Sequence, residues 1–404
     1  MSTALEGELP TPGEICQAYF GTTNMEEMQN IMEELELGDG SHLAFSDDNF
    51  DTGLFPYQAE GPLEAPIPTP AEILAAKPAG LDSYVWRVGP YIVKVGGNAK
   101  RFQEAENLLY LERNSTVRTP KLYAAFMSAE VDVFSSGELS PDKEPKMAYY
   151  IVMEYIDGMS LSKAFREAEK MRDEGIDGTS LSEMLREGEK TWDEGKELPM
   201  CDFEFKITQL AAEQLRKLRS VPPEDPNHFG RVNGGAFNHL QLIYNPPDRR
   251  NWGPFDYEGF VSRMVHSSKI FHSYNGCDED FSDVAKSMYR HAKQVFLDMA
   301  GPSDRVPVLS HLDVHKQNMV VKVTRDEEGT LTGVEEVVII DWEWMAWVPP
   351  WFEAAEMMRL SLAEDEACKG LGISALHNMG KVNMAIVCFL GIGFLDGIFR
   401  AAHH

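Results

Sequence analysis

The stretch Val308-Leu-Ser-His-Leu-Asp-Val-His-Lys-Gln-Asn-Met-Val-Val321 decides the fold of this chain, together with the later run Val337-Val-Ile-Ile-Asp-Trp-Glu343. An aspartate is followed five residues later by an asparagine, and a second aspartate ends the later apolar run. Runs rich in β-branched residues predict strands, so Met319–Val323 and Val337–Ile340 are expected to be strands joined by an acidic turn that ends at Gly329. The return of the chain then brings both carboxylates and the amide together.

Asp313, Asn318 and Asp341 therefore form one predicted site. Transfer of a phosphoryl group from Mg-ATP needs a carboxylate that orients or deprotonates a hydroxyl, and it needs oxygen ligands for Mg²⁺. We predict Asp313 as the catalytic carboxylate and Asn318 and Asp341 as the metal ligands. His311 is expected to assist by bracing the loop through backbone hydrogen bonds, and His315 to pack. A zinc site of both histidines with Asp313 is the alternative, but no further ligand follows at a characteristic spacing.

A strand lysine and a helix glutamate lie earlier in the chain. Residues 84–95 predict a hairpin around Gly89-Pro90, and Lys94 lies in its second strand. Ten residues later Glu104 opens a helical pattern. In kinases such a lysine, oriented by such a glutamate, holds the α- and β-phosphates of ATP. Glu106 competes for the role of partner, because one helical turn offers both carboxylates.

The segment Met147–Gly158 reads as a buried strand that ends in a glycine turn. After the lysine and glutamate, we interpret it as a hinge whose backbone hydrogen-bonds adenine. Met153, Glu154 and Ile156 are the residues expected at the nucleotide, with the backbone of the last two facing the base. A plain core strand is the alternative interpretation.

These motifs together resemble the aminoglycoside phosphotransferase and choline kinase-like superfamily, especially its fungal branch. The resemblance implies an α+β, bilobal, protein-kinase-like fold with a small β-rich N-lobe and a larger, mainly helical C-lobe. It also implies ATP and Mg²⁺ as cofactors, and transfer of the γ-phosphate to a hydroxyl or amine of a small molecule. The matching segments are Pro68–Ile73, Val93–Gly96, Glu104–Glu106, Ile151–Gly158, Gly253–Phe255, His311–Asn318 and Ile339–Glu343.

Two departures from that family pattern concern the phosphate site. The family usually has His-Gly-Asp where this chain has Leu312, and glycine allows backbone conformations that leucine avoids. In addition, no GxGxxG motif precedes the lysine strand, and the candidate loop is only Pro78–Ser83. A catalytically weak or inactive kinase-fold binding or scaffold protein is therefore the alternative to an active phosphotransferase.

The chain divides into three predicted parts: an N-terminal extension (1–70), an N-lobe that ends in the hinge (71–157) and a C-lobe (158–404). Capping boxes at Thr11–Glu14 and Thr69–Glu72 predict two short helices.

Further helices are expected on the C-terminal side of the hinge. A charged helical segment at 161–175 is repeated at 181–195, and longer helices are expected at 203–219, about 256–272 and about 280–300.

Four of the seven tryptophans cluster after Asp341. Aromatic faces with interleaved carboxylates can hold an ammonium group, and in choline-type kinases this region contributes to the substrate pocket. The residues predicted for a cationic, hydroxylated substrate are Glu343, Trp344, Trp347 and Trp351. Core packing behind the metal site is the alternative, and Trp342 is expected to do that.

Composition excludes several classes of partner. Lys and Arg total 37 against 65 Asp and Glu, a formal charge of −28, which repels nucleic acid and anionic membranes. Any phosphate site must therefore be built locally. Five scattered cysteines, with no CxxC pair and no secretory signal, predict a reduced cytoplasmic chain. The apolar run at 382–399 contains Asn383 and Asp396 and is expected to be a buried core helix.

Overall fold

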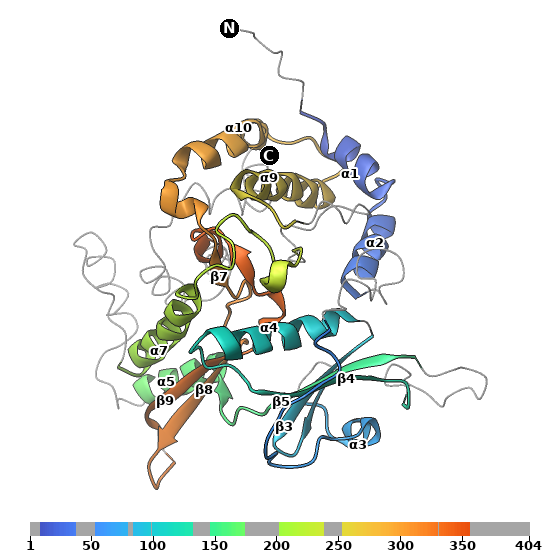
Figure 1. The fold of residues 1–404 in the computed structure, drawn as a ribbon. Coiled ribbons are helices and arrows are strands. Elements are labelled where there is room, and N and C mark those ends of the chain that lie inside the picture. The colour runs from blue at the N-terminus through green and yellow to red at the C-terminus, as the bar shows by residue number, and fades with distance from the viewer. Residues whose placement is uncertain are drawn as a thin grey trace.

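A sheet lobe and a mainly helical lobe lie on either side of helix α4 in the computed structural model (Figure 1). The predicted α+β, bilobal fold, with a small β-rich N-lobe and a larger, mainly helical C-lobe, is confirmed. The structure describes residues 9–37, 53–79, 84–97, 99–131, 146–173, 202–237, 253–329 and 331–355. The second copy of the repeat at 181–195 and the apolar run at 382–399 lie outside the described residues.

The N-lobe is a five-stranded antiparallel sheet in the order β1-β4-β5-β3-β2. The predicted hairpin is confirmed as β2 and β3, and in β3 Lys94 lies opposite Val85 on one side and Ile151 on the other. Alternate residues of β3 are buried on the face away from the lysine, as a half-buried strand requires. The strands are β1 (Tyr57–Gln58), β2 (Val85–Val88), β3 (Tyr91–Gly96), β4 (Leu122–Ser128) and β5 (Ala148–Glu154).

Helix α4 (Phe102–Asn114) packs against β4 and β5 on one side and against the turn η6 (Trp342–Trp344) on the other. Every residue from Phe102 to Leu111 is buried, including two glutamates, a glutamine and an asparagine. A helix buried all round must satisfy its polar side chains internally. This requirement explains the ion pairs and amide hydrogen bonds described below.

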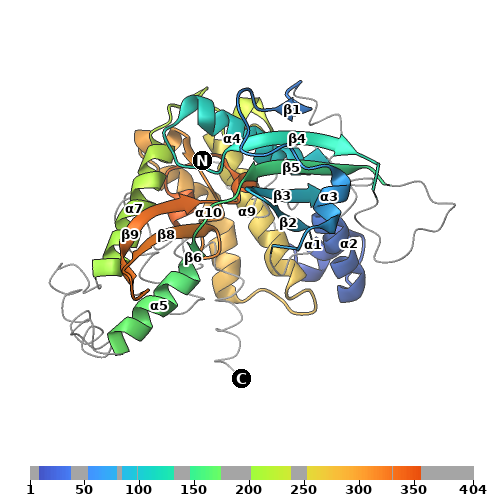
Figure 2. The same cartoon turned by 90° about the horizontal axis from the view of Figure 1, so that it is seen from below.

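The C-lobe carries two small sheets and four helices in its described part (Figures 1 and 2). Helix α7 lies on β9, and α9 packs against α10. The strands are β6 (Met159–Ser160), β7 (Val308–Ser310), β8 (Met319–Arg325), β9 (Leu331–Ile339) and β10 (Ala346–Val348). The helices are α5 (Leu161–Asp173), α7 (Asp202–Arg219), α9 (Tyr257–Tyr274) and α10 (Asp283–Met299).

Gly158 lets the chain leave the hinge close to β8. A Cβ at this position would lie 2.7 Å from Val320 Cγ1 and 2.8 Å from the carbonyl oxygen of Val321. Contacts this short with backbone cannot be relieved by side-chain movement. The glycine at the end of the predicted hinge is therefore required by close packing.

The N-terminal residues contact both lobes. Helix α1 (Pro12–Phe20) packs on α9, whereas β1 joins the N-lobe sheet through β4. Both predicted capping boxes are present, at α1 and at α3 (Pro70–Ala75). Helix α2 (Met25–Leu37) follows α1. The predicted boundaries at 70 and 157 stay a prediction. Within the described residues, no helix combines the length and the hydropathy needed to cross a membrane.

Candidate active site

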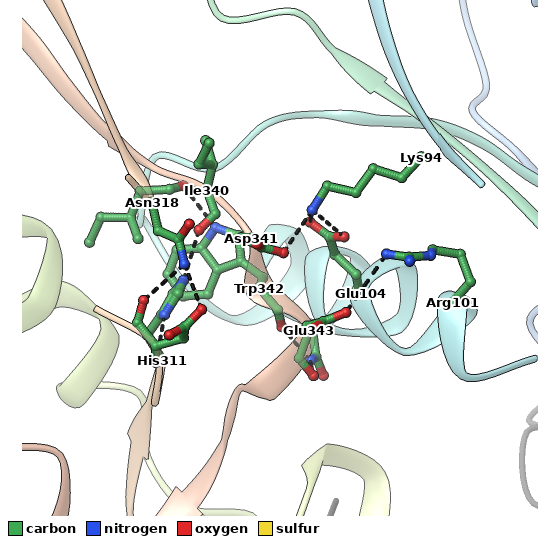
Figure 3. A network of polar contacts seen from close by, with 12 residues as sticks. Lys94, Arg101, Glu104, His311, Asn318, Ile340, Asp341, Trp342 and Glu343 are labelled. Carbon is green, nitrogen blue, oxygen red and sulfur yellow. Dashed lines mark hydrogen bonds and ion pairs between the residues drawn. The ribbon is translucent and has the colours of Figure 1, made fainter. Parts of the chain in front are cut away.

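Lys94 joins the two lobes through its ammonium group (Figure 3). Its Nζ lies 2.9 and 2.8 Å from the two carboxylate oxygens of Glu104 and 2.7 Å from Oδ1 of Asp341. Burial would lower the pKa of Lys94, but the two carboxylates outweigh burial and raise it. The same ammonium outweighs the effect of burial on Asp341 and lowers the pKa of that carboxyl. Lys94 and Asp341 are thus an ion pair at neutral pH, whereas burial outweighs the ammonium at Glu104 and raises the pKa of that carboxyl.

Glu104, rather than Glu106, is the partner of Lys94. Glu106 points to the C-lobe side of α4, where the guanidinium of Arg231 donates to its Oε2 and Asn233 Nδ2 donates to its Oε1 at 2.9 Å. The side chains of Glu106 and Arg231 are almost completely buried. Two glutamates on one turn therefore have separate functions: one orients the lysine, and the other fixes the helix to the segment after α7.

The turn that follows Asp341 is fixed to α4 by amide side chains. Asn107 Nδ2 donates to the carbonyl of Trp342 at 2.7 Å, and Gln103 donates to the carbonyl of Glu343. Asp341 itself has φ 66° and ψ 62°, in the left-handed region. Non-glycine residues avoid that region at a cost of about 1–2 kcal/mol, so the surrounding contacts hold the aspartate in place.

His311 braces the loop that carries Asp313 and Asn318. It is buried, and burial lowers the pKa of its imidazole, so the ring is neutral near pH 7. Nε2 lies 2.9 Å from the carbonyl oxygen of Ile340, and Nδ1 accepts the backbone N–H of Asp313 at 3.2 Å. These partners assign the proton to Nε2. His311 therefore connects the loop to the strand end that carries Asp341.

Leu312 occupies the position where glycine is usual, and its φ is 68°. The loop thus keeps the left-handed conformation without the glycine. The leucine side chain is buried in the cluster that contains Phe260, Phe352 and Trp351. The free energy gained by burying the leucine side chain offsets the cost of its left-handed backbone, which explains how leucine can stand at this position in place of glycine.

Glu353 holds the loop from behind, whereas the sequence singled it out only as one of the carboxylates interleaved with the tryptophans. Its Oε1 accepts the backbone N–H of His311 at 2.6 Å and that of Leu312 at 2.9 Å. The side chain is 1% exposed, and Oε2 lies 3.7 Å from Nη1 of Arg219. Arg219 also donates to the carbonyl of Pro350 at 2.6 Å. A buried carboxylate that accepts two backbone N–H groups fixes the loop conformation.

Asp313 is ionised and partly exposed. Asn318 Nδ2 donates to its Oδ2 at 2.7 Å and to its carbonyl oxygen at 3.0 Å, and His315 Nε2 lies 3.4 Å from its Oδ1. Burial would raise the pKa of Asp313, but the hydrogen bond and charge of His315 outweigh it and lower the pKa. A carboxylate with a lowered pKa is a weak base, so it orients a hydroxyl better than it removes the proton.

Asn318 and Asp341 fit a magnesium ion chemically. Both Nδ2 hydrogen bonds of Asn318 are directed to Asp313, and no described residue bonds its Oδ1. Lys94 takes Oδ1 of Asp341, and no described residue bonds the other oxygen of this carboxylate, which is 35% exposed. An amide oxygen and a carboxylate oxygen are ligands that Mg²⁺ prefers. The predicted zinc alternative receives no support, because His311 uses both nitrogens in backbone hydrogen bonds.

The predicted hinge residues lie at the end of β5. Met153 is buried in the core. The N–H of Glu154 donates to the carbonyl of Lys121 at 2.9 Å, so this donor is not available to a base. Arg118 holds the Glu154 carboxylate with two N–H groups at 2.9 and 2.5 Å. The adenine donor predicted at this hinge would then be the backbone of Ile156.

Three charged side chains connect the hinge to the C-lobe. Arg118 Nε lies 3.3 Å from Oε1 of Glu336 in β9, and Lys322 Nζ in β8 lies 2.9 Å from Oε2 of Glu336. All of these side chains are between a quarter and a third exposed. The cluster therefore adds charge contacts across the lobes without burying them.

The tryptophans divide between core and site. Trp347 and Trp351 are 1% and 7% exposed and pack in the hydrophobic core, so they present no face to a ligand in this structure. Lys100 Nζ lies 4.6 Å from the ring centroid of Trp344, and Arg101 Nη1 lies 3.7 Å from Oε2 of Glu343. The aromatic and acidic groups predicted for a cationic substrate are thus in contact with cations of the same chain.

Comparisons with known proteins give a likeness in overall structure. An apo thermostable mutant of aminoglycoside phosphotransferase APH(4)-Ia is 14% identical with a TM-score of 0.41, over 79% of this chain and 85% of that chain. A choline/ethanolamine kinase family protein from Mesorhizobium loti is 12% identical with a TM-score of 0.36, over 79% of this chain and 76% of that chain. No family model matches the sequence. No curated protein matches it either.

Proposed function

We propose that this protein is an ATP-dependent phosphotransferase that acts on a hydroxyl group of a small molecule. The observation that carries the proposal is the convergence of Lys94, Glu104 and Asp341 beside the loop that presents Asp313 and Asn318. Charge stabilisation and positioning account for most of the catalysis of phosphoryl transfer, and this site supplies both. A hydroxyl acceptor is preferred to an amine, because an alkylamine is protonated near neutral pH and has no lone pair for attack, whereas a hydroxyl keeps its lone pairs and donates a hydrogen bond to the ionised aspartate.

Each residue has a defined task in the proposed reaction. Bound Mg-ATP would supply the phosphoryl group and the cation that neutralises it. Lys94, oriented by Glu104, would hold the non-transferred phosphates, while Asn318 and Asp341 would hold the metal. Asp313 would align the acceptor hydroxyl. As the new oxygen–phosphorus bond forms, the bond from the γ-phosphorus to the β–γ bridging oxygen would break, ADP would leave, and Asp313 would take up the hydroxyl proton late in the transfer.

The charge of the acceptor is not part of this proposal. A cationic acceptor was predicted from Glu343 and Trp344 among others. Glu343 is in contact with Arg101, and Trp344 is in contact with Lys100. A ligand cation would have to displace a side-chain cation that is tethered and therefore present at high effective concentration.

The experiment is a screen of hydroxylated small molecules, amines included, for acceptor-stimulated ADP release by the wild type and by Asp313→Ala. We expect at least one acceptor to stimulate the wild type, and the variant to lose about 10²–10⁴-fold of that rate. Binding of the ATP analogue AMP-PNP should persist in the variant within a few-fold. Undiminished transfer by Asp313→Ala would contradict the mechanism. Nucleotide binding by the wild type without any transfer would indicate a kinase-fold binding protein instead.

A further inference from the structure

Arg101 is a cation at the candidate nucleotide site that the proposed mechanism does not yet use. It ends the short turn η2 (Ala99–Arg101), which connects the lysine strand β3 to α4. Its side chain lies across the end of that strand, because a Cβ added at Gly96 would be 3.1 Å from both Cβ and Nε of Arg101. The guanidinium is thereby directed toward Glu343, with Glu104 and the ammonium of Lys94 beyond it (Figure 3).

The contacts of Arg101 leave most of its donors unused. Its ion pair with Glu343 is long, at 3.7 Å, and both side chains are 25% exposed. Nε is buried and makes no hydrogen bond with any described residue. An arginine carries five N–H donors in a rigid fork that matches phosphate oxygens. A guanidinium that is weakly paired and a quarter exposed can therefore turn from Glu343 to an anion.

The need for a second cation follows from the rest of the site. Lys94 already shares its ammonium between two carboxylates. No glycine-rich motif precedes it, and the chain as a whole carries a charge of −28. The charge of Arg101 acts on both neighbours: it opposes the rise in the pKa of Lys94 and contributes to the lowered pKa of Asp341.

We propose that Arg101 leaves Glu343 when nucleotide binds and holds the terminal phosphates of Mg-ATP. This inference rests on the proposed function. It adds a residue that substitutes for the phosphate-binding loop absent from the sequence. In this arrangement Lys94, which contacts Asp341, serves the inner phosphates, and Arg101, beside Glu343, supplies the second cation for the terminal phosphates.

The neighbouring residue Lys100 provides a matched control. It lies on the same turn and carries the same charge, but its Nζ is placed over the ring of Trp344. The variant Lys100→Gln removes one positive charge from the turn and leaves the side chain of Arg101 in place. A difference between the two variants therefore reports a direct contact rather than net charge.

The test measures the affinity of the full-length protein for AMP-PNP, ADP and AMP by titration calorimetry in Mg²⁺. Arg101→Gln should weaken AMP-PNP about 10–100-fold, the effect of a lost charge-assisted hydrogen bond to phosphate, and leave AMP within about 2-fold. Lys100→Gln should change all three by less than about 3-fold, and Arg101→Lys should restore part of the loss. The unfolding temperatures of the ligand-free variants establish that each is folded.

Two results would overturn the inference while leaving the proposed function intact. One is equal AMP-PNP affinity of Arg101→Gln and the wild type. The other is an equal loss for AMP and AMP-PNP, which would mean that Arg101 only fixes α4 to the turn at Glu343. Absence of AMP-PNP binding to the wild type would instead overturn the nucleotide site itself, and this inference with it.

Discussion

Two buried glutamates hold the two halves of the candidate site, and they do so in different ways. Glu104 binds the side chain of Lys94, which is shared with a partly exposed aspartate. Glu353 binds the backbone N–H groups of His311 and Leu312. A side-chain ion pair can exchange partners when a ligand arrives, whereas a backbone contact fixes the path of the chain. The nucleotide half is therefore built to change its contacts, and the loop half is built to keep them.

The largest effect is expected from breaking the loop half. Glu353→Ala removes the acceptor of two buried N–H groups and the counter-charge of Arg219, so the free energy of unfolding should fall by about 3–5 kcal/mol. Urea denaturation measures this loss. If the variant does not fold, Glu353→Gln keeps one acceptor oxygen and should lose less. Glu343→Gln is the control, because this carboxylate is a quarter exposed and pairs with Arg101 only at 3.7 Å, and it should lose less than about 1 kcal/mol.

If the free energy of unfolding of Glu353→Ala falls by less than about 1 kcal/mol, the loop keeps its conformation without Glu353. The contrast between an exchangeable half and a fixed half would then fail.

The two glutamates of α4 sharpen the same comparison within one helix. Glu106→Gln leaves Arg231 buried without a counter-charge, and we expect a loss of about 2–3 kcal/mol in stability. Glu104→Gln leaves Lys94 paired with Asp341, so stability should change less while AMP-PNP affinity falls. Denaturation and nucleotide titration of both variants separate the two roles. Equal effects of the two variants in both measurements would contradict the assignment.

Leu312 tests how the loop half tolerates its backbone strain. Leu312→Gly relieves about 1 kcal/mol of left-handed strain but loses about 2–4 kcal/mol of buried packing, so a net loss of about 1–3 kcal/mol is expected. Leu312→Ala loses nearly the same packing and keeps the strain. The alanine variant should therefore unfold at lower urea than the glycine variant. The reverse order would show that φ at this position is not left-handed in solution.

The smallest effect is expected at the hinge. Arg118→Gln breaks contacts with Glu154 and Glu336 that are partly exposed, and such pairs contribute about 1 kcal/mol or less. AMP-PNP affinity should fall by a few-fold at most, and increasing salt should reduce the difference from the wild type. A tenfold or greater loss of AMP-PNP affinity would mean that the charged cluster at the hinge belongs to the half of the site that changes its contacts when nucleotide binds.

The residues proposed to act could be named from the sequence because they lie in short motifs, and the structure brings them together. Lys94 sits ten residues before Glu104, and Asp313 five before Asn318. Strand and turn patterns also predicted the hairpin, both capping boxes and the helices at α7, α9 and α10. These features depend on local propensity, which a single sequence carries.

The groups that hold the site could not be predicted in the same way. Glu353 meets the loop across 42 positions, and Arg231 meets Glu106 across 125. No local pattern marks such partners. A charged residue in an apolar segment, as Glu353 is between Phe352 and Ala354, is the one signal available. The tryptophan cluster shows the opposite kind of error. The sequence predicted a place at the substrate for Trp347 and Trp351, but both rings pack in the core.

The central claim is that Lys94, Asn318 and Asp341 form a site for a magnesium nucleotide. The most direct measurement is calorimetric titration of AMP-PNP into the wild type and Asp341→Asn, each with and without Mg²⁺. We predict that Mg²⁺ strengthens binding to the wild type by at least tenfold, about 1.4 kcal/mol, and that the variant loses this enhancement. Binding that does not depend on Mg²⁺, or an enhancement that survives in Asp341→Asn, would contradict the claim.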